Sequence, residues 1–154
     1  MKTIVIGNGY SARDFELGDK IDSEFDIIVR LNRGFFEGVN GYEKYVGSKT
    51  NILIAHDGYA VPERLTDDVL NSLNQVRIVT PNFKFNQDNF DSANKQYGWG
   101  DKVQPISGAH ELNLRKIANF GSRWPTTGLI GLYYICMNYE DVTLYGFDNS
   151  DEKY

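Results

Sequence analysis

The segment Pro125-Thr126-Thr127-Gly128 combines residue types that suit an anion-binding helix start. Proline fixes the direction of the chain, and Thr126 or Thr127 can cap the helix by accepting a hydrogen bond from a first-turn N–H group. Gly128 has no side chain, so a ligand could approach the backbone closely there. Because free N–H groups and the helix dipole favour negative charge, we predict a site for phosphate or carboxylate. A capped core helix without any ligand is the alternative.

A second candidate is the glycine turn at residues 7–12, which follows an apolar run and fits the G-x-G-x-x-A pattern of dinucleotide-binding turns. Within it, the Asn8 amide can donate to and accept from a ribose or phosphate. An Asx hydrogen bond that stabilises the turn is an equal alternative. In a nicotinamide enzyme the next strand should end at an acidic residue that binds the ribose. This strand ends with Arg30 and Arg33 instead, which disfavours NAD and leaves NADP open.

Alternating strand and helix patterns must position these segments. Apolar runs predict strands at residues 2–6, 26–31, 51–55, 75–80 and 142–145. Helical spacing is found at residues 12–17, 62–73, 108–120 and 129–137, whereas residues 83–100 are predicted as a loop with one helical turn. This alternation is typical of a mostly parallel sheet covered by helices on both faces. We therefore predict a single α/β domain with a Rossmann-like fold.

Ligands of such sheets bind at the carboxyl ends of the strands. Those ends carry Asn8, Asn32, His56 and the pair Gly146–Phe147, so a shared cleft is expected there. His56 closes a predicted strand and is a candidate for substrate contact. His110 begins a predicted helix, which favours an ordinary capping or surface histidine.

Composition narrows the function further. The 154 residues suit one domain, and a net charge of −5 with a pI near 5.0 argues against general nucleic-acid binding. No apolar run is long enough to span a bilayer, and no signal peptide is visible. The single cysteine, Cys136, excludes an internal disulfide and is expected as a buried free thiol. These features predict a cytoplasmic protein.

Several motifs follow one another in an order that is similar to that of a known family. A strand running into Gly7-Asn8-Gly9 is followed by Ile21-Asp22 and then by a strand ending in Arg30-Leu31-Asn32. The segments Val46-Gly47-Ser48-Lys49-Thr50, Pro125-Thr126-Thr127-Gly128 and Leu144-Tyr145-Gly146-Phe147 complete the series. In this order they resemble the sialyltransferases with eukaryotic-type sialylmotifs, glycosyltransferase family 29. The resemblance is closest to the branch that forms α2,8 linkages, from which no linkage is inferred.

This resemblance implies a variant GT-A, Rossmann-like fold and CMP-sialic acid as the donor substrate, with no cofactor and no metal. The donor-binding residues that it implies are Asn8, Gly9, Ser11, Asn32, Thr126, Thr127, Gly128, Gly146 and Phe147. The asparagines would hold the nucleotide and phosphate, the threonine segment the phosphate and sugar carboxylate, and the last two residues the cytidine. Ser11 is included only because it lies near the turn. The implied reaction is an inverting transfer of sialic acid to a glycan hydroxyl, with a histidine as base.

The chain departs from the family pattern in two respects. The two downstream motifs that supply the family's histidines have no counterpart, so the catalytic base is unknown and the domain, residues 1–154, is expected to be truncated at its C-terminal side. The family's disulfide is missing, because Thr3 and Tyr139 occupy the matching positions. Its loss, without a membrane anchor, predicts a bacterial or viral type of cytoplasmic protein. Three functions stay open: a sialyltransferase, an inactive CMP-binding domain and an NADP-dependent oxidoreductase.

Overall fold

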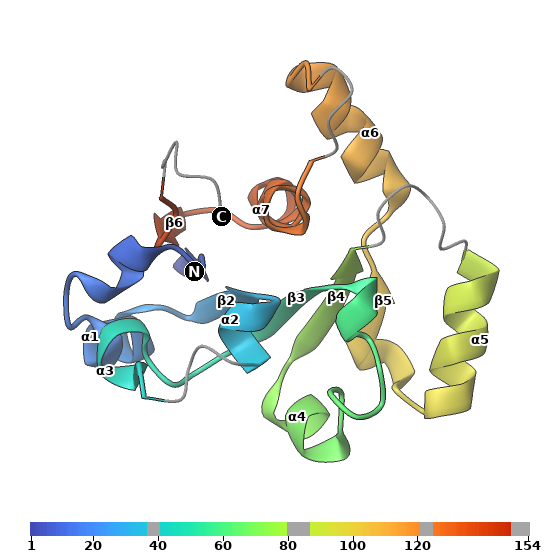
Figure 1. The fold of residues 1–154 in the computed structure, drawn as a ribbon, viewed down its shortest axis with the longest axis horizontal. Coiled ribbons are helices and arrows are strands. Elements are labelled where there is room, and N and C mark those ends of the chain that lie inside the picture. The colour runs from blue at the N-terminus through green and yellow to red at the C-terminus, as the bar shows by residue number, and fades with distance from the viewer. Residues whose placement is uncertain (37–40, 80–86, 121–124, 149–154) are drawn as a thin grey trace.

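The computed structural model describes residues 1–36, 41–79, 87–120 and 125–148. Within these residues, six parallel strands form one sheet in the order β5-β4-β3-β2-β1-β6 (Figure 1). The strands are β1 (Thr3–Ile6), β2 (Ile27–Leu31), β3 (Ile52–His56), β4 (Gln75–Val79), β5 (Val103–Pro105) and β6 (Val142–Tyr145). The predicted parallel α/β architecture is confirmed.

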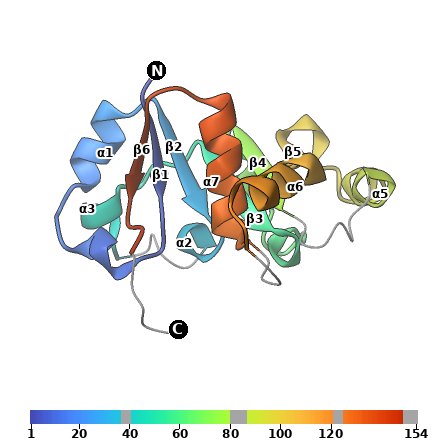
Figure 2. The same ribbon diagram turned by 90° about the horizontal axis from the view of Figure 1, so that it is seen from above.

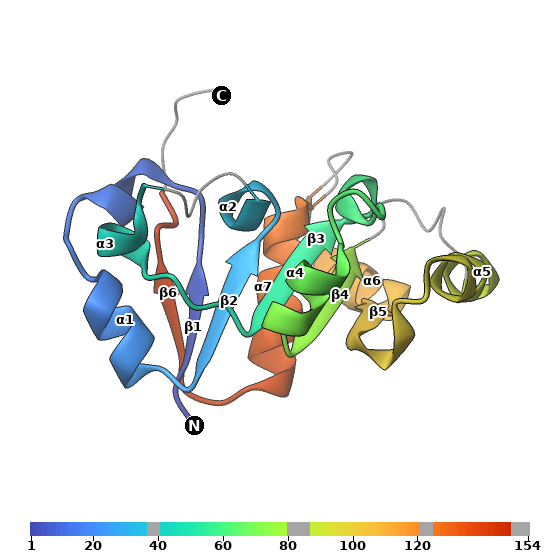
Figure 3. The same cartoon turned by 90° about the horizontal axis from the view of Figure 1, so that it is seen from below.

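Helices cover both faces of the sheet, which also confirms the prediction (Figures 2 and 3). One side carries α6 (Gly108–Ile117) and α7 (Thr127–Asn138), and the other carries α1 (Gly18–Glu24), α3 (Glu43–Val46) and α4 (Asp67–Ser72). Successive side chains of a strand point to opposite faces. Val5 and Val29 therefore join the core under α7, whereas Ile4 and Ile28 join the core under α1 and α3.

The remaining described helices are short or lie at the periphery. They are η1 (Tyr10–Arg13), α2 (Arg33–Phe36), η2 (Asp57–Tyr59), α5 (Gln87–Tyr97) and η4 (Gly100–Lys102). The prediction of a loop over residues 83–100 is wrong for α5, because Phe90 and Ala93 form an apolar stripe that packs on the same core as Trp99. The short strand β5 was not predicted, since three residues carry no readable periodicity.

The predicted helix at residues 12–17 is also wrong. The chain forms η1 there, and Gly18 begins α1 instead of limiting a helix. Gly18 lies so close to the carbonyl oxygen of Glu43 that a Cβ atom at this position would overlap with it. The close packing of α1 on α3 therefore explains the glycine.

Two expectations about burial near the end of the chain are corrected. Strand β6 is an edge strand rather than a buried one, and Leu144 is 48% exposed. Cys136 is exposed rather than buried. Helix α7 turns Ile130, Gly131 and Ile135 towards the sheet, and the residue after Ile135 is rotated away by about 100°.

The connections of the sheet change sides at β1. The chain leaves β1 for β2 through α1 on one face, and it reaches β6 through α6 and α7 on the opposite face (Figures 1 and 2). Ligands of α/β proteins bind outside the carboxyl ends of strands, at such a change of side. The fold therefore predicts a ligand site at the carboxyl ends of β1 and β6.

Candidate functional site

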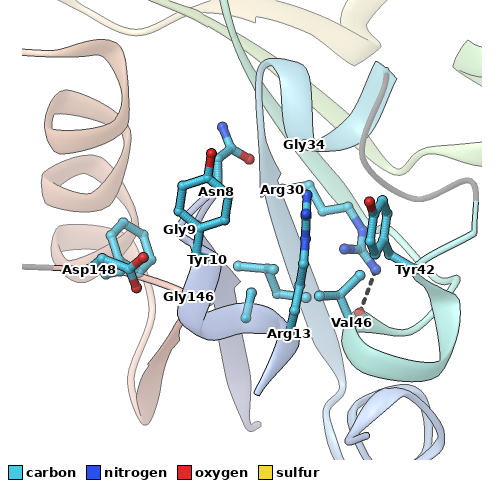
Figure 4. A pocket seen from close by; sticks show the side chains of 14 residues that line it. Asn8, Gly9, Tyr10, Arg13, Arg30, Gly34, Tyr42, Val46, Gly146 and Asp148 are labelled. Atoms are coloured by element: carbon cyan, nitrogen blue, oxygen red, sulfur yellow. Dashed lines mark hydrogen bonds between the residues drawn. The ribbon is translucent and has the colours of Figure 1, made fainter. Parts of the chain in front are cut away.

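A cavity of about 770 Å³ opens at the carboxyl ends of β1 and β6 (Figure 4). Its lining residues come from β1, the glycine turn, η1, β2, α2, the start and end of α3 and the loop after β6. They are Ile6, Gly7, Asn8, Gly9, Tyr10, Ala12, Arg13, Arg30, Gly34, Tyr42, Val46, Gly146, Phe147 and Asp148. Four predicted site residues are among them: Asn8, Gly9, Gly146 and Phe147.

The glycine turn and the loop after β6 are joined by their backbones. The N–H of Gly7 donates to the carbonyl of Tyr145 and that of Gly9 donates to the carbonyl of Gly146, both at 2.8 Å. A Cβ atom on Gly9 would lie 2.6 Å from the carboxyl carbon of Asp148. Gly146 has a φ of +72°, and a Cβ there would lie 2.7 Å from that of Ala12. Packing within the protein explains these glycines, which present backbone to the cavity.

Asn8 is exposed at the rim of the cavity. Its Nδ2 lies 3.5 Å from the carbonyl oxygen of Leu31, the last residue of β2, which is a long hydrogen bond. The amide therefore reaches across from β1 to β2, and among the described residues it makes no Asx bond within its own turn. Most of its hydrogen-bonding capacity is left for a ligand.

Asn32 does not line the cavity, and its side chain has a structural task. The Oδ1 atom accepts a hydrogen bond of 2.6 Å from the N–H of His56, which ties the ends of β2 and β3 together. The backbone φ of +39° lies in the left-handed region, where asparagine is tolerated better than most residues. The Nδ2 group is the part of Asn32 that is left for a ligand.

The start of α7 is capped as predicted, by Thr126 rather than Thr127. The Thr126 hydroxyl accepts a hydrogen bond of 3.2 Å from the N–H of Leu129. This helix start does not line the cavity either. A Cβ atom on Gly128 would lie 3.5 Å from Cδ1 of Leu31, so the first turn packs beside the carboxyl end of β2. Leu31 is thus the common neighbour of Gly128 and Asn8.

Ser11 does not line the cavity, and its polar groups bind the protein itself. Its N–H lies 3.2 and 3.3 Å from the two carboxylate oxygens of Asp148, and its hydroxyl donates to the same group. The hydrogen bond from the Ser11 hydroxyl holds the pKa of Asp148 below its usual range. Asp148, rather than Ser11, faces the cavity.

Arg30 is buried, with 2% of its surface exposed, and it binds protein carbonyls. Its Nη2 donates to the carbonyls of Val46 and Gly47 at 2.8 Å each, and its Nε donates to Oγ1 of Thr50 at 2.9 Å. Burial lowers the pKa of Arg30 to about 10, while the charge of Asp22 opposes this effect. The guanidinium is therefore not available for the 2′-phosphate of NADP. The side chain of Arg33 lies outside the described residues.

Asp22 binds the same segment that Arg30 contacts, residues 46–50. Its carboxylate accepts hydrogen bonds from the N–H of Ser48 at 2.8 Å and of Lys49 at 3.1 Å. The Lys49 ammonium donates to the backbone carbonyl of Asp22 at 2.8 Å. Burial raises the pKa of Asp22, but the hydrogen bonds from Ser48 and Lys49 outweigh it and leave the pKa below its usual range. The segment of residues 46–50 serves the fold.

These bonds give a pH-dependent prediction. Because the pKa of Asp22 is lowered by folding, its stabilising effect is complete above the pKa of the unfolded chain, near 3.9, and is lost as the pH falls further. Asp22→Asn should lower the free energy of unfolding by about 1 kcal/mol at pH 7 and by much less at pH 3. Urea unfolding at both pH values measures this difference in the free energy of unfolding between the variant and the wild type. The control Glu24→Gln, on an exposed position of α1, should follow the wild type; a gap that stays constant down to pH 3 would contradict the assignment.

Neither histidine lies at the cavity. Nδ1 of His56 accepts a hydrogen bond of 3.0 Å from the N–H of Gly58 and lies 2.6 Å from Oδ1 of Asp57. Nδ1 of His110 lies 3.3 Å from the carbonyl oxygen of Ser107, and its ring contacts Tyr134. The described residues therefore offer no histidine base at this site.

Four lining residues whose side chains could contact a ligand were not predicted: Tyr10, Arg13, Tyr42 and Asp148. Tyr10 and Arg13 follow the glycine turn closely, and this nearness was the only indication for them. Tyr42 and Asp148 are distant in the sequence, and only the fold brings them to the turn.

The fold is similar to that of solved sialyltransferases. A crystal structure of a mammalian sialyltransferase matches it with a TM-score of 0.68 and 20% identity, over 97% of this chain and 55% of that one. Another, in complex with Gal-beta-1-3GalNAc-ortho-nitrophenol, gives the same TM-score. The model of glycosyltransferase family 29 (sialyltransferase) matches residues 1–99, so the chain belongs to this family.

The curated relatives agree with this assignment. The human CMP-N-acetylneuraminate-beta-1,4-galactoside alpha-2,3-sialyltransferase is 41% identical over 71 residues, which are 45% of this chain and 18% of the relative. The human type 2 lactosamine alpha-2,3-sialyltransferase is 32% identical over 83 residues, or 54% of this chain and 22% of the relative. The chain thus matches about a fifth of the length of these proteins. Both names specify α2,3 linkages, so they do not support the nearness to the α2,8 branch.

The relatives also correct the predicted localisation. They are sialyltransferases of human, chimpanzee, orangutan and rat, so the expectation of a bacterial or viral type of cytoplasmic protein is wrong. Within the described residues, no helix combines the length and the apolar character that a membrane crossing requires.

Proposed function

We propose that this chain is the donor-binding part of a sialyltransferase, which binds CMP-sialic acid and transfers the sialic acid to a glycan hydroxyl. The observation that supports this most is the convergence of Asn8, the start of α7 and the Gly146–Phe147 loop on adjoining strand ends in a family 29 protein. The human relative that is 41% identical carries CMP-N-acetylneuraminate in its name.

Each part of this site has a role that suits its chemistry. The amide of Asn8 can bind ribose or phosphate oxygens at the cavity rim. The first turn of α7, a helix of twelve residues, offers N–H groups and a positive dipole to an anion. Phe147 is 39% exposed beside the cavity, and its ring can stack on the cytosine.

The proposed reaction is a displacement at the anomeric carbon of the sialic acid. The acceptor oxygen forms a bond to this carbon as the bond to the phosphate oxygen breaks, and CMP leaves with the electron pair. The proton of the acceptor hydroxyl passes to a base. Since neither histidine lies at the cavity, we assign the base to the part of the family's length that this chain does not cover. An inactive CMP-binding domain is the alternative that the same observation supports.

Calorimetric titration with CMP tests the donor site, with CDP and NADPH as controls. Asn8→Ala and Asn32→Ala should each weaken CMP binding about fivefold, the effect of a hydrogen bond worth about 1 kcal/mol. The control Asn138→Ala removes an exposed amide at the other end of α7 and should bind CMP like the wild type. Unchanged affinity in both site variants, or selective binding of NADPH, would contradict the proposal.

Asn32 needs a second variant, because Asn32→Ala also removes the acceptor for the N–H of His56. Asn32→Asp keeps an oxygen for that bond and replaces the Nδ2 donor by a negative oxygen. This variant should retain the melting temperature better than Asn32→Ala and should bind CMP more weakly than the wild type. If its CMP affinity is unchanged, Asn32 serves only the strand ends.

A further inference from the structure

The cavity has a cationic wall that lies apart from the start of α7. Arg13 ends η1, and its guanidinium carbon lies 3.9 Å from the ring centroid of Tyr42 and 5.7 Å from that of Tyr10. Figure 4 shows the Arg13 side chain between these two rings at the cavity. Stacking on a ring holds the guanidinium flat and leaves its N–H groups free to point outward. Arg13 is therefore an oriented cation.

Two acidic groups near Arg13 are engaged elsewhere. Among the described residues, Arg13 forms no ion pair. Asp148 is the carboxylate that lines the cavity, and it accepts hydrogen bonds from Ser11. Glu16, three residues after Arg13, pairs with Lys44 at 2.8 Å. The chain has a net charge of −5, yet Arg13 has no carboxylate partner at the cavity. Its position therefore favours an anionic ligand.

Arg30 adds to the positive character of this wall. It lines the cavity, but its N–H groups are bound to the carbonyls of Val46 and Gly47. Its charge is fixed in place; among the described residues no carboxylate forms an ion pair with it, and the charge of Asp22 acts on it from a greater distance. Arg30 can therefore favour an anion through its field, whereas Arg13 can bind one directly.

We propose that Arg13, held on the ring of Tyr42, binds an anionic oxygen group of the ligand that fills this cavity. This inference rests on the proposed donor, CMP-sialic acid, which has two such groups: a phosphate and a carboxylate. The proposed contacts with negative groups then lie at two separate places, the start of α7 and Arg13, and the first of them does not line the cavity. A donor with two negative groups can place one group at the start of α7 and the other at Arg13.

Calorimetry with CMP, N-acetylneuraminate and cytidine tests the site, because these ligands carry only the phosphate, only the carboxylate or neither. Arg13→Gln should weaken binding of CMP or of N-acetylneuraminate about tenfold and leave cytidine binding unchanged. The ligand that loses affinity identifies the group that Arg13 binds. Arg13→Lys should recover only part of the loss, since an ammonium lacks the flat face and the forked donors.

Arg64→Gln is the matched control. The Arg64 guanidinium lies 4.4 Å from the ring centroid of Tyr59 and 5.4 Å from that of Phe36, but it does not line the cavity. This variant loses the same charge from the same kind of stack and should bind like the wild type. If Arg13→Gln retains wild-type affinity for both anions, or loses no more than Arg64→Gln, the anion site is refuted while the donor site stands. If the wild type binds neither CMP nor N-acetylneuraminate, both proposals fall.

Discussion

Arg30→Met should lower the free energy of unfolding by about 3 kcal/mol or more. The guanidinium holds the carbonyls of Val46 and Gly47 and the hydroxyl of Thr50. Methionine fills a similar volume but donates no hydrogen bond. Removal of the donor therefore leaves buried carbonyl oxygens without their partner, at a cost of about 1–3 kcal/mol each that is not fully additive.

The measurement is urea unfolding, with the melting temperature as a second readout. A loss of this size corresponds to a fall of roughly 6 to 12 °C for a domain of this length. Arg30→Lys keeps a charge and part of the hydrogen bonding, so it should lie between methionine and the wild type, and it provides a result if the methionine variant does not fold.

Arg64→Met is the control for the loss of an arginine as such. Arg64 is half-buried on the rings of Phe36 and Tyr59, and its truncation should cost less than about 1 kcal/mol. Equal losses at Arg30 and Arg64 would show that the carbonyl network is not what stabilises residues 46–50.

Arg30 also shows what the sequence could and could not reveal. The positions of most strands along the chain and the cap of α7 are local patterns. Buried strands form apolar runs, and the Thr126 hydroxyl accepts from an N–H group only three residues away. Alternation along β2 also places Arg30 on the same face as the buried Ile28, under α3. That periodicity argues against Arg30 as a free contact for the phosphate of NADP.

Other parts of the site depend on contacts that no local pattern encodes. Ser11 is bound by Asp148, which lies 137 residues further along the chain. Arg13 meets Tyr42 only because α3 packs against η1. Helix α5 has few apolar residues, and the burial of Phe90 on the core stabilises it. The strand ends could therefore be predicted from the sequence, whereas the side chains that face the cavity depend on three-dimensional packing.

Gly7→Ala should destabilise the protein by about 2 kcal/mol or more, because a Cβ atom at this position would overlap the carbonyl oxygen of Gly146. This oxygen cannot retreat freely, since it accepts the hydrogen bond from the N–H of Gly9 at 2.8 Å. The collision separates β1 from the loop after β6 and opens the floor of the cavity. Urea unfolding should show the loss without any ligand present.

Gly128→Ala is the counterpart, in which the protein leaves room for the added methyl group. The new Cβ would lie 3.5 Å from Cδ1 of Leu31, an ordinary contact, and alanine favours a helix over glycine by up to about 1 kcal/mol. Its stability should therefore equal or exceed that of the wild type. If the donor phosphate or carboxylate approaches the first turn of α7, the same methyl group should weaken donor binding.

The two variants together separate a glycine that the fold requires from one that the ligand requires. A stable Gly128→Ala protein with reduced CMP-sialic acid affinity would mean that the space above this residue is kept for the donor. A stable variant with unchanged affinity would mean that the start of α7 is only a capped core helix, and the donor's negative groups would then have to bind at Arg13 and Asn8 alone.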